Sequence, residues 1–579
     1  MLAWGHWAYI RLSMSAQLRL TLLLLLLPAS ICYATEVPHW LPQYQLELKL
    51  DLKSKRLWGV EKVTFHNRHD RTANELVFNA YARYKIPEAD SIKLAKTLEL
   101  LRSNPSDGID WIGERLQVQA VFTQDARGIQ RAIPFVWRKD IHTALEVSLP
   151  TPVNKNESVT IEIHFTLDLP EKEGRWGHRE GITFLTHAIP ALAYYDETGW
   201  QPTPFVAWHQ PFFQEAGIYN VRLTLPEDQK VACTGTILAE SPLGDGTKLV
   251  SIASCCAREF SFCCSNRYQE WTRTVERTRV RVLALPEHAA MAERCLEVAC
   301  EAIPLYNRWF GPYPFGDFCI AESHFAWNGN ECSGMVMIDS RVMKLTPIMS
   351  RYIDHLISHE TLHQWWYNIV GTNGYKETFM DEGVACYYTA KVLQKKFGRN
   401  SKLLQYPFGQ DVLPNVKHED YRFYGMYGTL ARKEENVNVQ ENGKIRNIHT
   451  LFSMNYDRGA KIFNMIEERL GEEALFDFMR LLYAKYQFRI LFVKDFQSEL
   501  ETYTGRSWQE FFNRWLYNVG SSDWKLNDVS LSKGDGSTVR ATIRVQQLSE
   551  FTEPTYLGFK FKGDKEYSLR VPVRPGEIL

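Results

Sequence analysis

The sequence predicts a multidomain α+β protein in which two β-rich regions flank a central, mainly helical region. Apolar and polar residues alternate over residues 46–52 and 159–169, a pattern typical of half-buried strands. From residue 290 onward the apolar residues recur every three or four positions, which is typical of amphipathic helices. Alternation returns beyond residue 520, for example over residues 539–545. These changes of period give the predicted order of the regions.

The N-terminal segment favours an export signal. Arg19 precedes a leucine-rich run that includes residues 22–27, and small residues around Ala34 provide a cleavage site. The uncharged stretch is about 15 residues long, shorter than the ~20 needed to span a bilayer. We therefore expect residues 1–34 to be a cleaved signal peptide of a periplasmic or extracellular protein with no stable membrane span. An uncleaved signal would leave the protein associated with the membrane.

The changes of period also set the expected domain boundaries. Residues 35–285 form an N-terminal β-rich domain, since alternation continues in residues 219–225 and 280–285. Residues 286–520 form the helical domain. Residues 521–579 form a C-terminal β segment, which is small for an independent sandwich. Its strands either pack on the helical domain or form a shortened β module.

The composition is that of an ordinary globular protein. The chain has 579 residues, of which 45% are hydrophobic, enough for about three or four domains. Its net charge of −1 and its dispersed basic residues argue against a nucleic-acid partner, and its oligomeric state stays open. The 11 cysteines show no regular framework, so disulfide pairing also stays open. Cys255-Cys256 and Cys263-Cys264 flank a strand-like segment and are interpreted as small buried side chains.

The most informative motif is His359-Glu360-Thr361-Leu362-His363. Apolar residues recur at helical spacing from residue 352 to residue 369, so a helix is expected up to Gly371. Residues four apart lie on one face of a helix, and both imidazoles can therefore bind one ion. Glu382 follows the second histidine after 18 intervening residues, at the start of a second predicted helix. A His-Glu-x-x-His match alone arises by chance, but the placement of Glu382 favours a metal site.

These ligands predict a catalytic rather than a structural zinc site. Two imidazoles and one carboxylate leave the fourth tetrahedral position to water. Glu360, beside the first ligand, is the expected general base for that water. His355 lies one turn earlier on the same face, but three ligands are already assigned. A structural hydrogen-bonding role is therefore expected for His355.

The surrounding residues resemble the aminopeptidase N family of zinc metallopeptidases, in particular its bacterial-type members. The family shares the histidine motif, the gap of 18 residues and the glutamate. The resemblance implies a saddle-like β-rich N-terminal domain and a thermolysin-like catalytic domain, whereas no counterpart of the family's large helical C-terminal domain is indicated. The motifs that carry it are 309–315 (WFGPYPF), 363–368 (HQWWYN), 380–383 (MDEG) and 511–516 (FFNRWL).

Glu331 is the expected substrate-recognition residue. Family members carry a Gly-x-Met-Glu-Asn loop whose glutamate binds the free α-amino group, and residues 328–334 (NGNECSG) resemble it at Glu331. The resemblance places Gly329 and Asn330 in the same substrate-binding loop. A carboxylate on an edge strand beside the metal would pair with an ammonium group. The alternative is a solvated acid in an Asn/Gly turn.

Tyr456 is the expected oxyanion-stabilising residue. Residues 456–461 (YDRGAK) resemble the family's Tyr-x-Lys-Gly-Ala motif. A phenol beside the metal would stabilise charge as it develops in the transition state. Buried tyrosines are common core residues and this chain has 27 of them, so Tyr424 and Tyr427 remain alternatives.

Together these residues predict a zinc aminopeptidase that acts on peptides with a free N-terminus. Glu360 would take a proton from water and return it to the leaving amine. Asp381 would orient the metal ligands from behind, or would simply be an acid favoured at a helix N-terminus. Two alternatives are a zinc hydrolase of a non-peptide epoxide, as in one branch of the family, and a catalytically inactive binding scaffold.

Overall fold

The computed structural model describes residues 37–124, 128–207, 212–399, 401–409, 412–418, 445, 448–520, 522–549, 551–564, 567–574 and 576. The expected signal peptide over residues 1–34 lies outside the described residues. Within the described ranges, the helices are all too short or too polar to cross a membrane.

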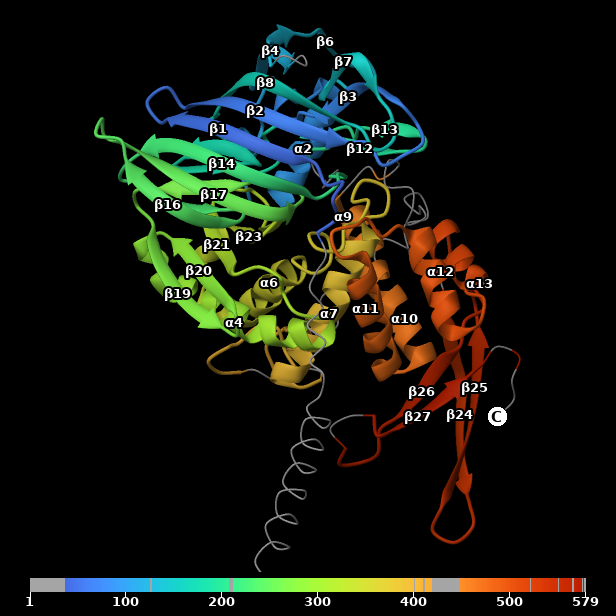
Figure 1. Cartoon of the computed structure of the whole chain (residues 1–579). Coiled ribbons are helices and arrows are strands. Elements are labelled where there is room, and N and C mark those ends of the chain that lie inside the picture. The colour runs from blue at the N-terminus through green and yellow to red at the C-terminus, as the bar shows by residue number, and fades with distance from the viewer. Residues whose placement is uncertain are drawn as a thin grey trace, which may run out of the picture. The chain divides into compact units, whose positions relative to one another are not determined.

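An eight-stranded sheet dominates the N-terminal region (Figure 1). Leu46, Leu48 and Leu50 of its strand β1 are buried and alternate with exposed polar residues, as the sequence pattern predicts. Strand β1 pairs antiparallel with β2 and parallel with β14. In sheet order the strands are β16 (Thr236–Pro242), β17 (Thr247–Ala257), β14 (Gly217–Pro226), β1 (Gln43–Asp51), β2 (Arg56–His66), β8 (Ser158–Asp168), β4 (Leu116–Gln124) and β5 (Gln130–Ala132).

Three smaller sheets and two short helices complete this region. Helix α2 (Glu88–Leu100) was not indicated by the alternating pattern, and it packs with α3 (Pro105–Gly108). The first sheet has the order β15 (Lys230–Cys233), β18 (Phe262–Ser265), β10 (Ile182–Leu185) and β9 (Trp176–Arg179). The second has the order β11 (Ala191–Leu192), β3 (Ala73–Asn79), β7 (Ala144–Val153) and β6 (Phe135–Trp137). The third pairs β12 (Tyr194–Asp196) with β13 (Gly199–Gln201).

The buried side chain of Glu61 in β2 makes the stability of the fold depend on pH. Its side chain is fully buried, and neither carboxylate oxygen has a hydrogen-bond partner among the described residues. Burial raises the pKa of Glu61 well above its ordinary value of 4.5. The folded state therefore retains a proton that the unfolded state releases, and stability falls as the pH rises from about 4.5 to the folded-state pKa.

We accordingly expect Glu61→Gln to unfold at a higher temperature than the wild type at about pH 8, because the amide never pays the cost of ionisation. The two proteins should converge as the pH falls towards about 5, at up to ~1.4 kcal/mol per pH unit. Scanning calorimetry across this range tests the expectation. A variant that is less stable than the wild type at the alkaline end would contradict it.

A five-stranded sheet links the β-rich region to the helices. Strands β20 and β21 are parallel and are joined by helix α4, so they form a βαβ crossover. The predicted boundary at residue 285 therefore falls between two paired strands of one sheet. Strand β22, which carries Glu331, lies at the sheet edge. The elements are β19 (Gln269–Val275), β20 (Thr278–Ala284), α4 (Ala289–Trp309), β21 (Asp317–Ser323), β22 (Gly329–Cys332) and β23 (Met335–Asp339).

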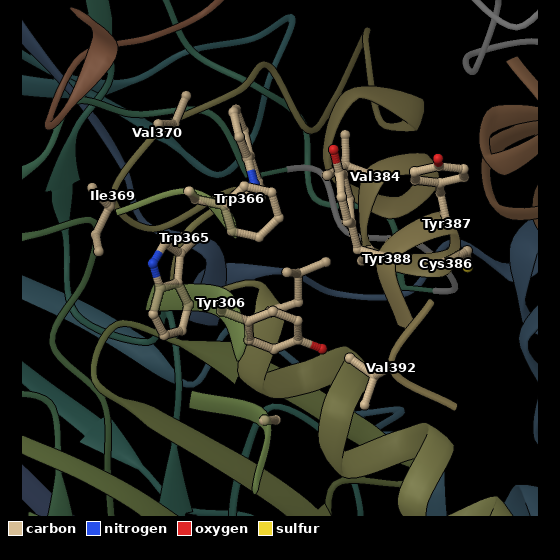
Figure 2. Close-up of a cluster of buried hydrophobic side chains, with 14 of the residues drawn as sticks. Tyr306, Trp365, Trp366, Ile369, Val370, Val384, Cys386, Tyr387, Tyr388 and Val392 are labelled. Atoms are coloured by element: carbon tan, nitrogen blue, oxygen red, sulfur yellow. The ribbon is translucent and has the colours of Figure 1, made fainter. Parts of the chain in front are cut away.

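The helical region packs around a large aromatic core. Figure 2 shows Trp365 and Trp366 beside Tyr306 of α4 and Tyr388 of α7, and all four side chains are buried. The rings of Tyr306 and Trp365 lie 5.4 Å apart. Its helices are α5 (Ser340–Met343), α6 (Ser350–Leu362), α7 (Phe379–Phe397), α9 (Ile448–Leu451), the π-helical turn η6 (Phe452–Arg458), α10 (Gly459–Leu470), α11 (Glu472–Tyr486), α12 (Val493–Thr504), α13 (Gln509–Phe512) and the π-helical turn η7 (Asn513–Tyr517).

Helix α6 is shorter than the sequence pattern predicts. It ends at Leu362 rather than continuing to residue 369, and His363 caps it with φ −59° and ψ −14°. The apolar spacing beyond Leu362 reflects burial in the aromatic core, not helix. The backbone N–H groups of Asn368 and Ile369 donate to carbonyls five residues back, and buried Arg258 donates to the carbonyls of Asn368 and Ile369 at 3.0 and 3.4 Å. His363 retains helical dihedrals, so it still shares a face with His359.

The C-terminal residues form two hairpins, β24 (Trp524–Lys533) with β25 (Val539–Gln547) and β26 (Thr555–Phe559) with β27 (Leu569–Val573). Glu553, between the hairpins, accepts hydrogen bonds from Arg514 at 2.8 Å and from the indole of Trp515 at 2.9 Å. Phe551 belongs to the core of the helical region. These contacts correspond to the first of the two expected arrangements, in which the segment packs on the helical region.

Candidate metal centre and active-site cavity

Three buried side chains converge at the predicted metal site. Nε2 of His359 lies 3.2 Å from Nε2 of His363 and 3.1 Å from Oε2 of Glu382. Nε2 of His363 lies 3.4 Å from the same oxygen. Ligands of a tetrahedral zinc ion with bonds of about 2.0 to 2.1 Å are separated by about 3.3 to 3.4 Å. The three donor atoms therefore fit a single zinc ion.

Two helices and one hydrogen bond orient these ligands. Helix α6 carries His359 and ends just before His363, while Glu382 lies in the first turn of α7. Nδ1 of His363 lies 3.1 Å from the carbonyl oxygen of Trp366 and donates to it. This hydrogen bond places the proton on Nδ1 and leaves the lone pair of Nε2 directed at the other two ligands.

The electrostatics of the group favour a cation. Burial alone would lower the pKa of His363, but the carboxylates of Glu331 and Glu382 raise it well above its ordinary value. Burial would likewise raise the pKa of Glu382, yet the two imidazoles lower it. Positive charge is thus stabilised at the point where the donor atoms meet, as a divalent ion requires.

The metal group opens into a cavity of about 740 Å³. This volume is typical of a small-molecule or peptide-end binding site. The cavity brings together the three kinds of residue predicted from the sequence: the metal ligands His359 and Glu382, the base Glu360, and Glu331. Its lining residues are Leu101, Arg175, Phe325, Trp327, Asn328, Gly329, Glu331, Tyr352, His355, Leu356, His359, Glu360, Glu382, Ile448, Leu451, Phe452 and Tyr456.

Strand β22 passes very close to Glu360. A Cβ atom added to Gly329 would lie 2.4 Å from Oε1 of Glu360 and 2.6 Å from its carboxyl carbon. Any larger residue at position 329 would therefore displace the carboxylate. Gly329 contributes to the site because, without a side chain, it leaves room for the carboxylate of Glu360.

Gly329→Ala is expected to lower kcat by about ten- to hundredfold, because a displacement of about 1 Å in a catalytic group is costly. Gly316→Ala is the matched control, since a Cβ at Gly316 meets no atom within 4 Å. Steady-state kinetics on an aminoacyl-coumarin substrate tests the effect. Equal kcat values for the two variants would contradict this role of Gly329.

Glu331 and Asn330 have different environments. Glu331 is 4% exposed and lines the cavity, and burial raises its pKa. Asn330 is absent from the described lining. Its amide accepts a hydrogen bond from Arg175 at 2.8 Å and lies 2.9 Å from the sulfur of Cys332. Asn330 therefore supports the strand, whereas Glu331 faces the substrate space.

Tyr456 lies beside the metal group. It belongs to the π-helical turn η6, and its hydroxyl donates a hydrogen bond to Oε1 of Glu382. A close approach of two glycines brings the helices together, since a Cβ on Gly383 would lie 2.7 Å from the carbonyl carbon of Gly459. The alternative candidates Tyr424 and Tyr427 lie outside the described residues.

Two further residues lie next to the ligands. The hydroxyl of Thr372 donates to Asp381 at 2.5 Å, and Asp381 accepts the backbone N–H of Glu382 at 2.7 Å. Asp381 thus fixes the first turn of α7. The ring of His355 lies 6.1 Å from that of His359, and His355 is not part of the metal group.

Arg175 is a cavity residue that the sequence motifs did not indicate. It precedes β9 and enters the cavity from the β-rich region, more than 150 residues before the histidine motif. No short-range pattern marks it, because its neighbours Gly174 and Trp176 belong to no motif of the site. Only the fold brings it beside Glu331.

Comparison with known proteins identifies the region that carries the site. Residues 294–515 match the profile of the family described as Peptidase family M1 domain. Aminopeptidase M1-B of Oryza sativa subsp. japonica is 22% identical over 255 residues, which are 43% of this chain and 28% of that protein. Human aminopeptidase Q is 27% identical over 161 residues, 26% of this chain and 15% of that protein. The chain thus spans less than a third of either relative's length.

The fold also resembles a solved structure. The M1 zinc metallopeptidase from Deinococcus radiodurans superposes with a TM-score of 0.53 at 15% identity, over 83% of this chain and 94% of that chain. The likeness establishes the arrangement of β-rich N-terminal sheets, a helical region and C-terminal hairpins. The group His359, His363 and Glu382 is a zinc site typical of this family.

Proposed function

We propose that this chain, a member of peptidase family M1 through its residues 294–515, is a zinc-dependent aminopeptidase that hydrolyses the N-terminal bond of peptides. One observation carries the proposal. A single cavity contains the zinc ligands His359 and Glu382 together with the carboxylates of Glu360 and Glu331. The first two are the parts needed to activate water, and the third is suited to an α-ammonium group.

Zinc, when bound by His359, His363 and Glu382, supplies Lewis-acid polarisation of a carbonyl and acidifies a water molecule. Glu360 takes the proton from that water and then transfers it to the departing amine. Tyr456 donates a hydrogen bond to the oxygen on which negative charge develops.

Glu331 determines where the peptide is cut. Its buried carboxylate pairs with the ammonium group of the substrate and positions the first peptide bond beside Glu360. An acetylated N-terminus offers no charge to Glu331. The cavity is therefore suited to the removal of single residues from free N-termini.

The test is a hydrolysis screen on a panel of aminoacyl-coumarins and on the same compounds with acetylated N-termini, with zinc content measured in parallel. Cleavage restricted to the free amines supports the proposal. A protein that binds one zinc per chain yet cleaves none of them would be a binding scaffold. Turnover of an epoxide alone would indicate the non-peptide alternative, which no contact in the cavity favours.

Glu331→Gln is expected to lower kcat/KM for free N-termini by at least about tenfold, mainly through KM, because the amide keeps the shape and loses the charge. The acetylated compounds provide the internal control, since they lack the ammonium group. If the wild-type protein cleaves free and acetylated substrates at equal rates, Glu331 does not have this role.

We also propose that the protein is exported to the periplasm or the extracellular space. The leucine-rich segment within residues 1–34 supports this location. Cell fractionation combined with N-terminal sequencing of the mature protein tests it. An intact N-terminus in the cytoplasmic fraction would exclude export.

A further inference from the structure

Arg175 is a buried cation inside the active-site cavity. Its side chain comes from the β-rich region and is only 6% exposed. It lines the same space as Glu331, Glu360 and His359. Among the described lining residues, Arg175 is the one arginine or lysine, so it dominates the positive charge that the protein itself contributes.

Among the described residues, no carboxylate forms a close ion pair with the guanidinium of Arg175, although the charge of Glu331 acts on it at longer range and raises its pKa. One Nη donates to the amide of Asn330 at 2.8 Å, while Nε is buried without a hydrogen-bond partner. The rings of Phe212 and Phe325 lie 4.6 and 5.2 Å from the guanidinium carbon.

Burial makes this charge costly, and the carboxylate of Glu331 offsets the cost only in part. Burial lowers the pKa of Arg175 to about 10, so the side chain still carries its charge at neutral pH. A buried charge without a close ionic partner destabilises the fold, and strongly perturbed charges of this kind are common at functional sites. The two aromatic rings stabilise the guanidinium by cation–π contacts, and the N–H groups of a guanidinium suit a planar anion.

The position of Arg175 points to one part of the substrate. It holds Asn330, the residue next to Glu331 in β22, so it lies beside the expected ammonium site rather than on the far side of the zinc ligands. A second cavity of about 580 Å³ shares Arg175 and Trp327 with the first and contains Lys172, Glu173 and Asp110 in its lining. Arg175 therefore borders both cavities.

We propose that Arg175 binds the side-chain carboxylate of the first substrate residue, so that the site prefers peptides beginning with glutamate or aspartate. The inference rests on the proposed aminopeptidase function and specifies its substrate class. A guanidinium binds a carboxylate through two parallel hydrogen bonds, which an amide of the same shape cannot reproduce. Glutamate and glutamine at the first position have the same shape and therefore differ only in charge and in the ability to accept two parallel hydrogen bonds.

The experiment compares glutamyl-coumarin with glutaminyl-coumarin on the zinc-loaded full-length protein. We expect kcat/KM to be about ten- to hundredfold higher for the glutamyl compound. Arg175→Met should abolish this ratio and Arg175→Lys should restore part of it. Arg179→Met is the matched control, because Arg179 lies four residues later and lines neither cavity. It should retain the wild-type ratio.

A binding measurement on the wild type avoids dependence on a variant that fails to fold. Free L-glutamate should raise the unfolding temperature of the zinc-loaded protein more than L-glutamine at equal concentration. A glutaminyl rate equal to or above the glutamyl rate would overturn the inference, as would a preference that survives Arg175→Met. Dependence on Arg175 only for dipeptides, which carry a terminal carboxylate that the coumarins lack, would also overturn it.

These outcomes separate the two proposals. If no aminoacyl-coumarin is cleaved, the aminopeptidase function itself fails. If apolar or basic first residues are cleaved faster than acidic ones, the function stands and the role of Arg175 fails.

Discussion

Glu360→Gln is expected to bind one zinc per chain and to lose about 10²- to 10⁴-fold in kcat. Glutamine has the same shape as glutamate but cannot accept a proton from water at neutral pH. Glu360 is 5% exposed, lines the cavity and lies outside the group of three metal ligands. The substitution should therefore remove the base and preserve the metal site.

The measurement pairs steady-state kinetics with elemental analysis of the same preparation. Glu293→Gln is a suitable control, since Glu293 is exposed on α4 and faces no part of the cavity lining. It should retain wild-type kcat and zinc. A zinc-loaded Glu360→Gln protein that turns over at the wild-type rate would exclude Glu360 as the base.

The metal ligands could be predicted from the sequence because their geometry is local. Helical spacing alone places His359 and His363 on one face, and the predicted start of the second helix places Glu382 opposite them. The early end of α6 did not disturb this prediction, since His363 keeps helical dihedrals. Arg258, more than 100 residues earlier in the chain, binds the carbonyl of Asn368 beyond this end, and no local pattern contains that contact.

The residues on the substrate side of the cavity could be predicted from the sequence less fully than the metal ligands. The motif around Glu331 indicated a binding loop, but it did not show that Asn330 is engaged by Arg175. The close approaches of Gly329 to Glu360 and of Gly383 to Gly459 are likewise properties of packed elements. Hydrophobic period predicts which face is buried, whereas it does not predict which residue from another region lies against it.

The regions of the fold followed the changes of hydrophobic period. Alternation in the first 285 residues predicted strands such as β1 and β8, which the structure contains. Helix α2 was missed because its apolar residues do not gather on one face. Leu94 and Leu98 are buried, whereas Ile92 and Leu100 are exposed. The crossover from β20 to β21 was also missed, since parallel pairing joins segments separated by a whole helix.

Removal of zinc is expected to abolish activity and to lower the unfolding temperature. Without an ion, the donor atoms of His359, His363 and Glu382 lie 3.1 to 3.4 Å from one another in a buried site, with no divalent charge between them. A ligand that binds only the folded state stabilises it by about 4 kcal/mol at a thousandfold excess over its Kd. Chelation should therefore eliminate both the catalytic centre and this stabilisation, and added zinc should restore them.

Activity assays and calorimetry before chelation, after chelation and after zinc addition test this expectation. His363→Ala should no longer bind zinc and should unfold at the temperature of the chelated wild type. His355→Ala, one turn before the motif, should still bind one zinc per chain because His355 is not part of the metal group. Full activity in chelated protein shown by elemental analysis to be free of metal would refute the zinc mechanism, since Glu360 alone cannot activate water and polarise the carbonyl together.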